Sequence, residues 1–198
     1  MVYRGLRKES YPLVPKVGRN PNLSWQELWN TEKEALRLFK ERAVPFLDFR
    51  PASDWEWLAI AQHHGLPTRL MDWTRNPLVA AYFAVENEYD GDSVVYAYEK
   101  SGYVSTDAIP DPFDLDVVAR FIPSHITPRI TAQAGLFTIH PKPQQPFSSD
   151  QLTKLVIKQA FRKDLKYTLY KFGVHRAALF PGLDGLAKHI EWLKTDEY

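Results

Sequence analysis

The chain contains no cysteine among its 198 residues. This absence excludes disulfides, cysteine nucleophiles and zinc sites with thiolate ligands. Long apolar runs are also missing, because no stretch approaches the roughly 18 consecutive apolar residues that span a membrane. The formal net charge is only +1, which provides no overall attraction to nucleic acid or to an anionic membrane. The first residues lack the pattern of a signal peptide, and we expect a cytoplasmic protein without membrane contact.

Aromatic residues and proline, in contrast, are abundant. Six Trp, ten Tyr and eleven Phe make up 14% of the chain, and 15 Pro outnumber 9 Gly. Aromatic side chains fill cores, and proline favours ordered connections. The length suits one domain, and neither repeats nor a linker-like segment divides the sequence. We therefore expect a single domain over residues 1–198.

Capping signals and hydrophobic spacing predict a mixture of helices and strands. Ser24 and Ser53 each precede a glutamate by three residues, which predicts helices that run to about residue 42 and to Gly65. Asn76 followed by Pro77 predicts the start of a third helix. Strands are expected within residues 1–7, 94–98, 129–140, 152–158 and 177–180. Three more helices are expected at 114–121, 161–172 and 183–193. Because helices and strands do not alternate regularly, the pattern favours an α+β fold with small twisted sheets flanked by helices.

The most informative segment covers residues 63–77, between the second and third predicted helices. It holds two His, two Arg, one Asp and two Thr, with Gly and Pro among them. Polar side chains of these types rarely build cores, and functional residues concentrate in connecting segments positioned by a rigid scaffold. The segment therefore predicts a binding or catalytic site.

Several motifs together resemble the FRG domain family, named for a Phe/Tyr-Arg-Gly near its start. Tyr3-Arg4-Gly5 matches that motif, and residues 58–74 match a long central one. Further matching pieces follow in the order of the family at 76–84, 129–137, 179–181 and 184–186. This resemblance by itself implies little about chemistry.

The order of the motifs also resembles that of the arginine-first ADP-ribosyltransferases. Those enzymes have aromatic-Arg-Gly on the first strand, then a polar strand leading to a helix, then a strand with Glu or Gln. Arg4, the segment 72–74 and Gln133 occupy these places here. The resemblance implies an ADP-ribosyltransferase-like fold, NAD as substrate, and cleavage of its nicotinamide glycosidic bond. Gln133, or Gly135 in a shifted register, departs from the usual Glu, without which an oxocarbenium-like sugar is harder to stabilise.

The predicted site follows from this second resemblance. The expected catalytic residues are Arg4, Asp72 and Gln133, and the expected dinucleotide contacts are Tyr3, Gly5, His64, Arg69, Trp73 and Thr74. Structural interpretations stay open beside these roles. Arg4 can pair with a carboxylate of the central segment, Arg69 can pair with Asp72, and Trp73 can belong to the core.

Two functional hypotheses follow. The first is an NAD-binding ADP-ribosyltransferase-like domain, such as a toxin or a phage-defence effector, with a protein or a nucleic acid as acceptor. The alternative is a non-catalytic module that binds or senses a nucleotide or nucleic acid with the same residues. Metal-dependent hydrolysis by His63, His64 and Asp72 ranks below both, because their spacing matches no standard ligand motif. The sequence does not determine the oligomeric state.

Overall fold

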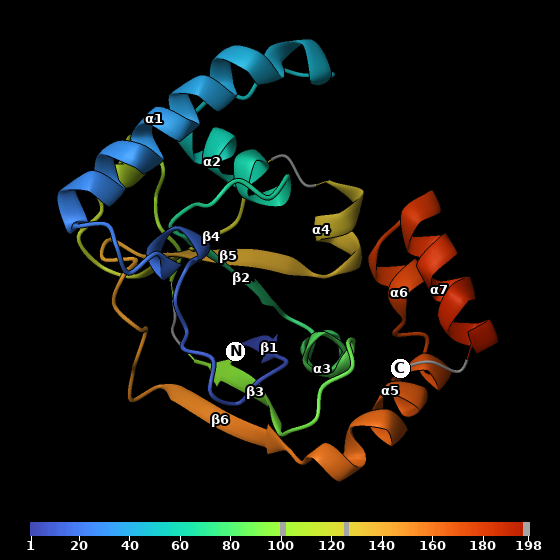
Figure 1. Ribbon diagram of the computed structural model, residues 1–198. Helices are drawn as coiled ribbons and strands as arrows, with labels where there is room; N and C mark the ends of the chain where they lie inside the picture. The colour runs from blue at the N-terminus through green and yellow to red at the C-terminus, as the bar shows by residue number, and fades with distance from the viewer. Residues whose placement is uncertain (100–101, 125–126, 196–198) are drawn as a thin grey trace.

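The computed structural model describes residues 1–99, 102–124 and 127–195, and they form a mixed α+β fold (Figure 1). The strands are β1 (Val2–Leu6), β2 (Leu70–Thr74), β3 (Ser93–Tyr98), β4 (Ala119–Phe121), β5 (Gly135–Ile139) and β6 (Leu152–Ile157). The α-helices are α1 (Trp25–Ala43), α2 (Asp54–His63), α3 (Pro77–Val85), α4 (Pro128–Ala132), α5 (Arg162–Lys171), α6 (Arg176–Leu179) and α7 (Leu183–Thr195).

The strands of the described residues form one antiparallel sheet in the order β4-β5-β2-β1-β3-β6. Each half of this sheet is well paired, with β1 matched to β3 from Val2 to Leu6. The two halves meet at one pair only, Tyr3 with Thr74. The small sheets expected from the sequence are therefore two three-stranded halves that share a single junction, and β1 and β2 separate beyond it.

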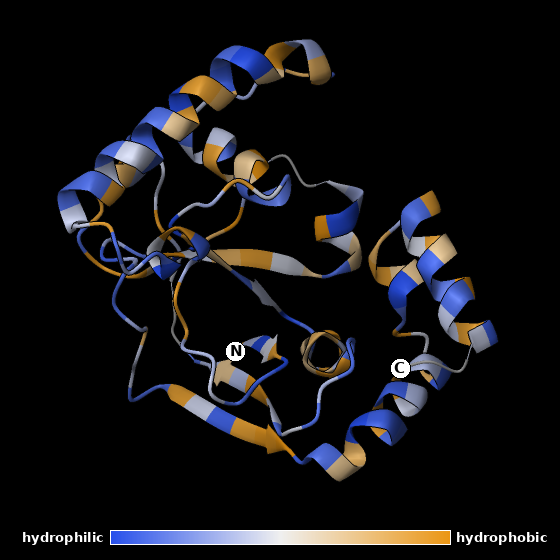
Figure 2. Ribbon diagram, in the orientation of Figure 1, coloured by the Kyte–Doolittle hydropathy of each residue, from blue (hydrophilic) through white to orange (hydrophobic). Residues whose placement is uncertain are grey.

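Three hydrophobic clusters hold these layers together. The first packs α1 and α2 against the β4-β5-β2 half, and the second packs α3 against β3, α5 and α6. The third lies on the opposite face of the sheet and includes Met71 and Trp73. Figure 2 shows α3 as hydrophobic almost all round, which is typical of a helix buried between layers. Its position beside β1 and β2 makes α3 one wall of the site described below.

The predicted helix starts are confirmed, and each has a local cause. Ser24 forms a full capping box with Glu27 at the start of α1. Ser53 accepts a hydrogen bond from the backbone of Glu56 at the start of α2. Asn76 accepts from the backbone N–H of Leu78 and is followed by Pro77 at the first position of α3. Gly65, with φ of 90°, ends α2 as expected.

Three predictions of secondary structure are wrong. Residues 114–121 form no helix, because the backbone of β4 pairs there with β5. Residues 129–140 begin as α4 rather than as a strand, since Thr127 accepts a hydrogen bond from Ile130 and Pro128 occupies the first helical position. Residues 177–180 are not a strand but the end of α6, which begins at the side-chain cap of His175. No helix within the described ranges is both long and apolar enough to cross a bilayer.

Candidate functional site

A cavity of about 680 Å³ opens where β1 and β2 separate. The end of α2, the helices α3 and α4 and the start of β5 complete its walls. Its size lies within the range of about 300–1,000 Å³ that is usual for small-molecule sites. All the predicted site residues except Arg69 line it: Tyr3, Arg4, Gly5, His64, Asp72, Trp73, Thr74 and Gln133.

Arg4 extends from β1 across the gap to β2. Its Nη1 donates a hydrogen bond to the backbone oxygen of Asp72 and lies 3.6 Å from Oδ2 of the same residue. The Arg4 side chain is 15% exposed, whereas that of Asp72 is 59% exposed. Burial lowers the pKa of Arg4, although the Asp72 carboxylate raises it, and a guanidinium stays charged under such conditions. The pair leaves the carboxylate open to the cavity, and Arg4 Nε is buried without a hydrogen-bond partner among the described residues.

A chain of hydrogen bonds from α2 orients Asp72. Gln62 Nε2 donates to Asp72 Oδ2 at 3.0 Å, and Thr68 Oγ1 donates to Gln62 Oε1 at 2.7 Å. The hydroxyl of Thr68 accepts in turn from the backbone N–H of Leu70. The sequence analysis missed Gln62. Its signal is a polar residue directly after the apolar run 57–61 of α2, three residues before Gly65.

Gly5 is needed for packing against α3. A Cβ on Gly5 would lie 1.8 Å from the backbone oxygen of Ala80 and 2.7 Å from the backbone nitrogen of Ala84. The glycine therefore permits the backbone of α3 to approach β1 closely. The glycine of the Tyr-Arg-Gly motif sets the wall of the cavity, while the arginine beside it extends across the gap.

Gln133 lies at the end of α4 and not on a strand. Its Nε2 donates to the backbone oxygen of Leu179 at 3.0 Å, and its own backbone oxygen accepts from Thr74 Oγ1 at 2.6 Å. These two bonds connect the end of α4 with α6 and with the end of β2. On β5, Gly135 lies opposite Thr74 and Phe137 lies opposite Asp72. Neither of these two positions provides a carboxylate.

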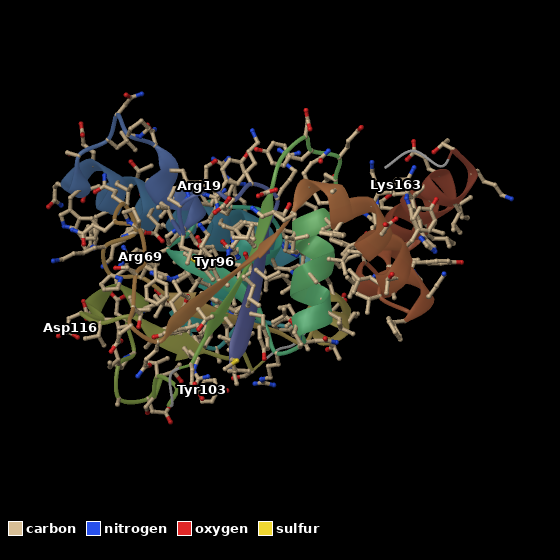
Figure 3. All side chains as sticks on the ribbon, turned by 90° about the horizontal axis from the view of Figure 1, so that it is seen from below. Arg19, Arg69, Tyr96, Tyr103, Asp116 and Lys163 are labelled. Carbon is tan, nitrogen blue, oxygen red and sulfur yellow. The ribbon has the colours of Figure 1, made fainter. Side chains whose placement is uncertain are left out.

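The predicted dinucleotide contact of Arg69 is wrong. Its side chain is 1% exposed and forms a buried ion pair with Glu32 of α1, with Nε and Nη2 at 3.0 and 2.9 Å from Oε2. Its guanidinium also lies 4.1 Å from the ring centre of Phe113. Figure 3 shows Arg69 far from Lys163 of α5. The partner Glu32 was missed, although it occupies the apolar face of α1 between Leu28 and Leu36.

Trp73 does not offer its ring to the cavity as a stacking surface. Side chains alternate along a strand, so Trp73 and Asp72 face opposite sides of β2. The indole is 3% exposed, donates from Nε1 to Thr138 Oγ1 at 2.8 Å, and packs against Tyr98 and Phe147. Its large ring fills the cluster beneath the sheet.

Cationic groups dominate the charge of the cavity. Asp72 is the only carboxylate among the described lining residues, and it faces the guanidinium groups of Arg4 and Arg129. His63 and His64 lie at the end of α2 with their rings 5.0 Å apart, and both line the cavity. Burial, with the nearby charges of His64 and Arg129, lowers the pKa of His63. The sequence analysis missed Arg129, whose only signal is an arginine in the motif of residues 129–137.

His140, behind the site, gives a testable dependence on pH. Thr138 Oγ1 accepts a hydrogen bond from Trp73 Nε1 and lies 2.8 Å from His140 Nε2. The Thr138 hydroxyl therefore donates its own proton to this nitrogen, which requires a neutral imidazole. Burial, reinforced by the charge of Arg4, lowers the pKa of His140 to about 3. In the unfolded chain this pKa is about 6.5. As the pH falls, His140 is therefore protonated in the unfolded chain before it is protonated in the folded protein.

We expect the contribution of neutral His140 to be lost as the pH falls from about 6.5 toward 3, by on the order of 3–5 kcal/mol in total. The free energy of unfolding, measured against pH for the wild type and His140→Gln, should show a shallower acid dependence in the variant. An NMR titration of the imidazole provides a direct check, and a midpoint near 6.5 contradicts the burial argument.

Comparison with known proteins supports the assignment of the N-terminal half. Residues 1–93 match the model of the FRG domain, a segment that includes the whole of β1, β2 and α3 and therefore Arg4 and Asp72. Comparison with curated proteins and with solved structures gives no match. The motifs beyond residue 93 lie outside the matched segment. Over residues 1–93 the chain is therefore similar to the FRG domain family.

Proposed function

We propose that the cavity binds a dinucleotide of the NAD type and that the chain cleaves the bond between nicotinamide and ribose, as an ADP-ribosyltransferase-like domain. The supporting observation is the meeting of Arg4 and Asp72 in one cavity of about 680 Å³. They belong to the two strands that correspond to the first and second motifs of arginine-first ADP-ribosyltransferases. Gln133, at the place of the third motif, lines the same cavity.

The charges of the cavity favour an anionic ligand. Guanidinium groups bind phosphate oxygens through paired, charge-assisted hydrogen bonds. Arg4 and Arg129 provide two such groups against the single carboxylate of Asp72. In the proposed complex the pyrophosphate lies between the two arginines, and the nicotinamide ribose lies toward Asp72.

The proposed reaction uses Asp72 to stabilise the sugar. The bond from C1′ to the nicotinamide nitrogen breaks, and its electron pair passes to that nitrogen, so nicotinamide leaves as a neutral molecule. The positive charge that develops on the ribose faces the Asp72 carboxylate, which Gln62 and Arg4 hold in place. Water, or a nucleophile of a protein or nucleic-acid acceptor, then bonds to C1′ and releases a proton. His63 accepts it, since its lowered pKa keeps the imidazole neutral at neutral pH.

The test is incubation with NAD labelled in the adenosine part, alone and with cell extract. We expect the wild type to release nicotinamide, and Asp72→Asn to release it roughly 10²–10³-fold more slowly, the usual cost of removing one electrostatic group from a transition state. Arg4→Gln should weaken NAD binding, measured by calorimetry. Asp116→Asn is a matched control, because Asp116 is exposed (Figure 3) and does not line the cavity.

The same experiment distinguishes the alternative, a non-catalytic module that binds or senses a nucleotide or nucleic acid. Gly135 and Phe137 beside Asp72 favour that alternative, since a transferase usually has a carboxylate on this strand. Binding of NAD that depends on Arg4 without release of nicotinamide supports the binding module. Folded protein that neither binds nor cleaves NAD overturns the proposal. Label transferred to protein or nucleic acid identifies the acceptor, and with it a role as a toxin or phage-defence effector becomes testable in cells.

A further inference from the structure

The guanidinium of Arg129 has unused hydrogen-bonding capacity at the cavity. Arg129 is exposed and lines the cavity, and within the described residues it donates no hydrogen bond and forms no ion pair. Arg4, in contrast, already donates to the backbone oxygen of Asp72 and pairs with its carboxylate. A guanidinium has five N–H donors in a planar fork, which suits the oxygens of a phosphate. The fork of Arg129 is therefore available to a ligand.

One aromatic ring supports this guanidinium. Arg129 lies over the ring of Phe180, 4.6 Å from the ring centre, which is within the limit of about 6 Å for a cation–π contact. Phe180 is not among the described residues that line the cavity. It therefore lies behind the arginine, where it contacts the cation and not the ligand. The motif of residues 179–181, to which the proposed function assigns no role, includes this ring.

The ring of Phe180 is itself held by its neighbours. It meets the ring of Phe83 of α3 at an angle of 81°, with 6.0 Å between the ring centres. The guanidinium of Arg176 lies 4.2 Å from the same ring centre and pairs with Glu86, directly after α3. The support of Arg129 is thus anchored to α3, another wall of the cavity.

A hydrogen bond joins α4, which includes Arg129, to α6. Gln133 at the end of α4 donates from Nε2 to the backbone oxygen of Leu179, the residue before Phe180. The two helices lie side by side (Figure 1). Because the two backbones are joined, the contact between Arg129 and Phe180 orders only the arginine side chain.

We propose that Phe180 is a positioning residue of the cavity, which orders the guanidinium of Arg129 to bind a diphosphate group of the ligand. This inference rests on the proposed binding of a dinucleotide. A long side chain that is already ordered loses less rotamer freedom when the ligand binds. A carboxylate partner would compete with the phosphate for the N–H groups, as Glu86 occupies part of the fork of Arg176. An aromatic ring supports the cation and leaves its donors free.

Calorimetry with ADP-ribose tests the role of Phe180. This probe contains the pyrophosphate and lacks the bond to nicotinamide, so its binding does not depend on cleavage. We expect Arg129→Gln to weaken binding roughly 10–100-fold, as the loss of hydrogen bonds to a charged group. Phe180→Leu should weaken it roughly three- to tenfold, and Phe180→Tyr, which retains the ring, should recover most of that loss. Phe172→Leu is a matched control, because Phe172 is 71% exposed and is not among the described lining residues.

A double-mutant cycle distinguishes positioning from a general effect on the cavity. If Phe180 acts through Arg129, Phe180→Leu should change the affinity by less than about twofold in the background of Arg129→Gln. Equal losses in the two backgrounds overturn the inference, because Phe180 then acts through Phe83 or through the fold. An affinity unchanged in Phe180→Leu also overturns it. Circular dichroism confirms that each variant is folded.

The outcomes separate this inference from the proposed function. Binding of ADP-ribose that depends on Arg129 and Phe180, without release of nicotinamide from NAD, supports the positioning role and contradicts the proposed cleavage. Release of nicotinamide, with an affinity for ADP-ribose that Phe180→Leu leaves unchanged, contradicts the positioning role alone. Folded wild type that binds neither NAD nor ADP-ribose overturns both.

Discussion

Gly5→Ala should destabilise the fold by at least about 4 kcal/mol, or prevent folding, which places it among the most severe single substitutions. The added Cβ would lie 1.8 Å from the oxygen of Ala80 and 2.7 Å from the nitrogen of Ala84. Both atoms belong to the backbone of α3, so no side-chain rotation can relieve the clash. The helix must move away from β1, and the second hydrophobic cluster then loses its packing. Urea unfolding followed by circular dichroism measures the loss.

Gly135→Ala provides the matched control within the same cavity. The nearest atom to a Cβ there is Ile130 Cγ2 at 3.4 Å, which is an ordinary contact, and the φ angle lies outside the left-handed region. We expect a change within about 1 kcal/mol. Equal losses in the two variants would show that the effect comes from replacing glycine in a strand and not from the contact with α3.

The parts of the fold that the sequence predicted are those with local causes. Ser24, Ser53 and Asn76 cap their helices through side chains close by in the chain, and such signals can be recognised in a sequence. The errors arose where distant pairing decided the outcome. Residues 119–121 are a strand because β5 lies beside them, which no local pattern records. The helix after Thr127 is the exception, since its cap and proline repeat the signal recognised at Asn76 and Pro77.

The sequence identified the main residues of the candidate site, and it did not identify the contacts between them. The motifs identified Arg4, Asp72 and Gln133, and the structure brings all of them to one cavity. Which arginine pairs with Asp72 could not be predicted, because Arg69 is only three residues away from it. The alternation of side chains along β2 decides which arginine pairs with Asp72. Asp72 faces the gap beside Arg4, while the neighbouring loop directs Arg69 into the core against Glu32.

Glu32→Gln should lower the free energy of unfolding by about 3–5 kcal/mol, the usual cost of removing one partner from a buried ion pair. Glu32 and Arg69 are both 1% exposed, so the change leaves the guanidinium charged and without its counter-ion in the core. Glu34→Gln is the matched control on the same helix. Glu34 pairs with Arg37 at the surface, where each side chain is 54% exposed, and such pairs contribute about 0–1 kcal/mol.

A double variant, Glu32→Gln with Arg69→Met, separates the cost of an unpaired charge from the value of the pair itself. Glu32 Oε1 accepts a hydrogen bond from the backbone N–H of Arg69 at 2.7 Å, and a glutamine oxygen retains that bond. Methionine fills the volume of the arginine stem beside Phe113 without a charge. Replacing both partners of a buried pair is often close to neutral, so we expect the double variant to be more stable than Glu32→Gln alone. If it is less stable, Arg69 contributes through its packing against Phe113 more than through its charge, and the loop before β2 is held by that contact.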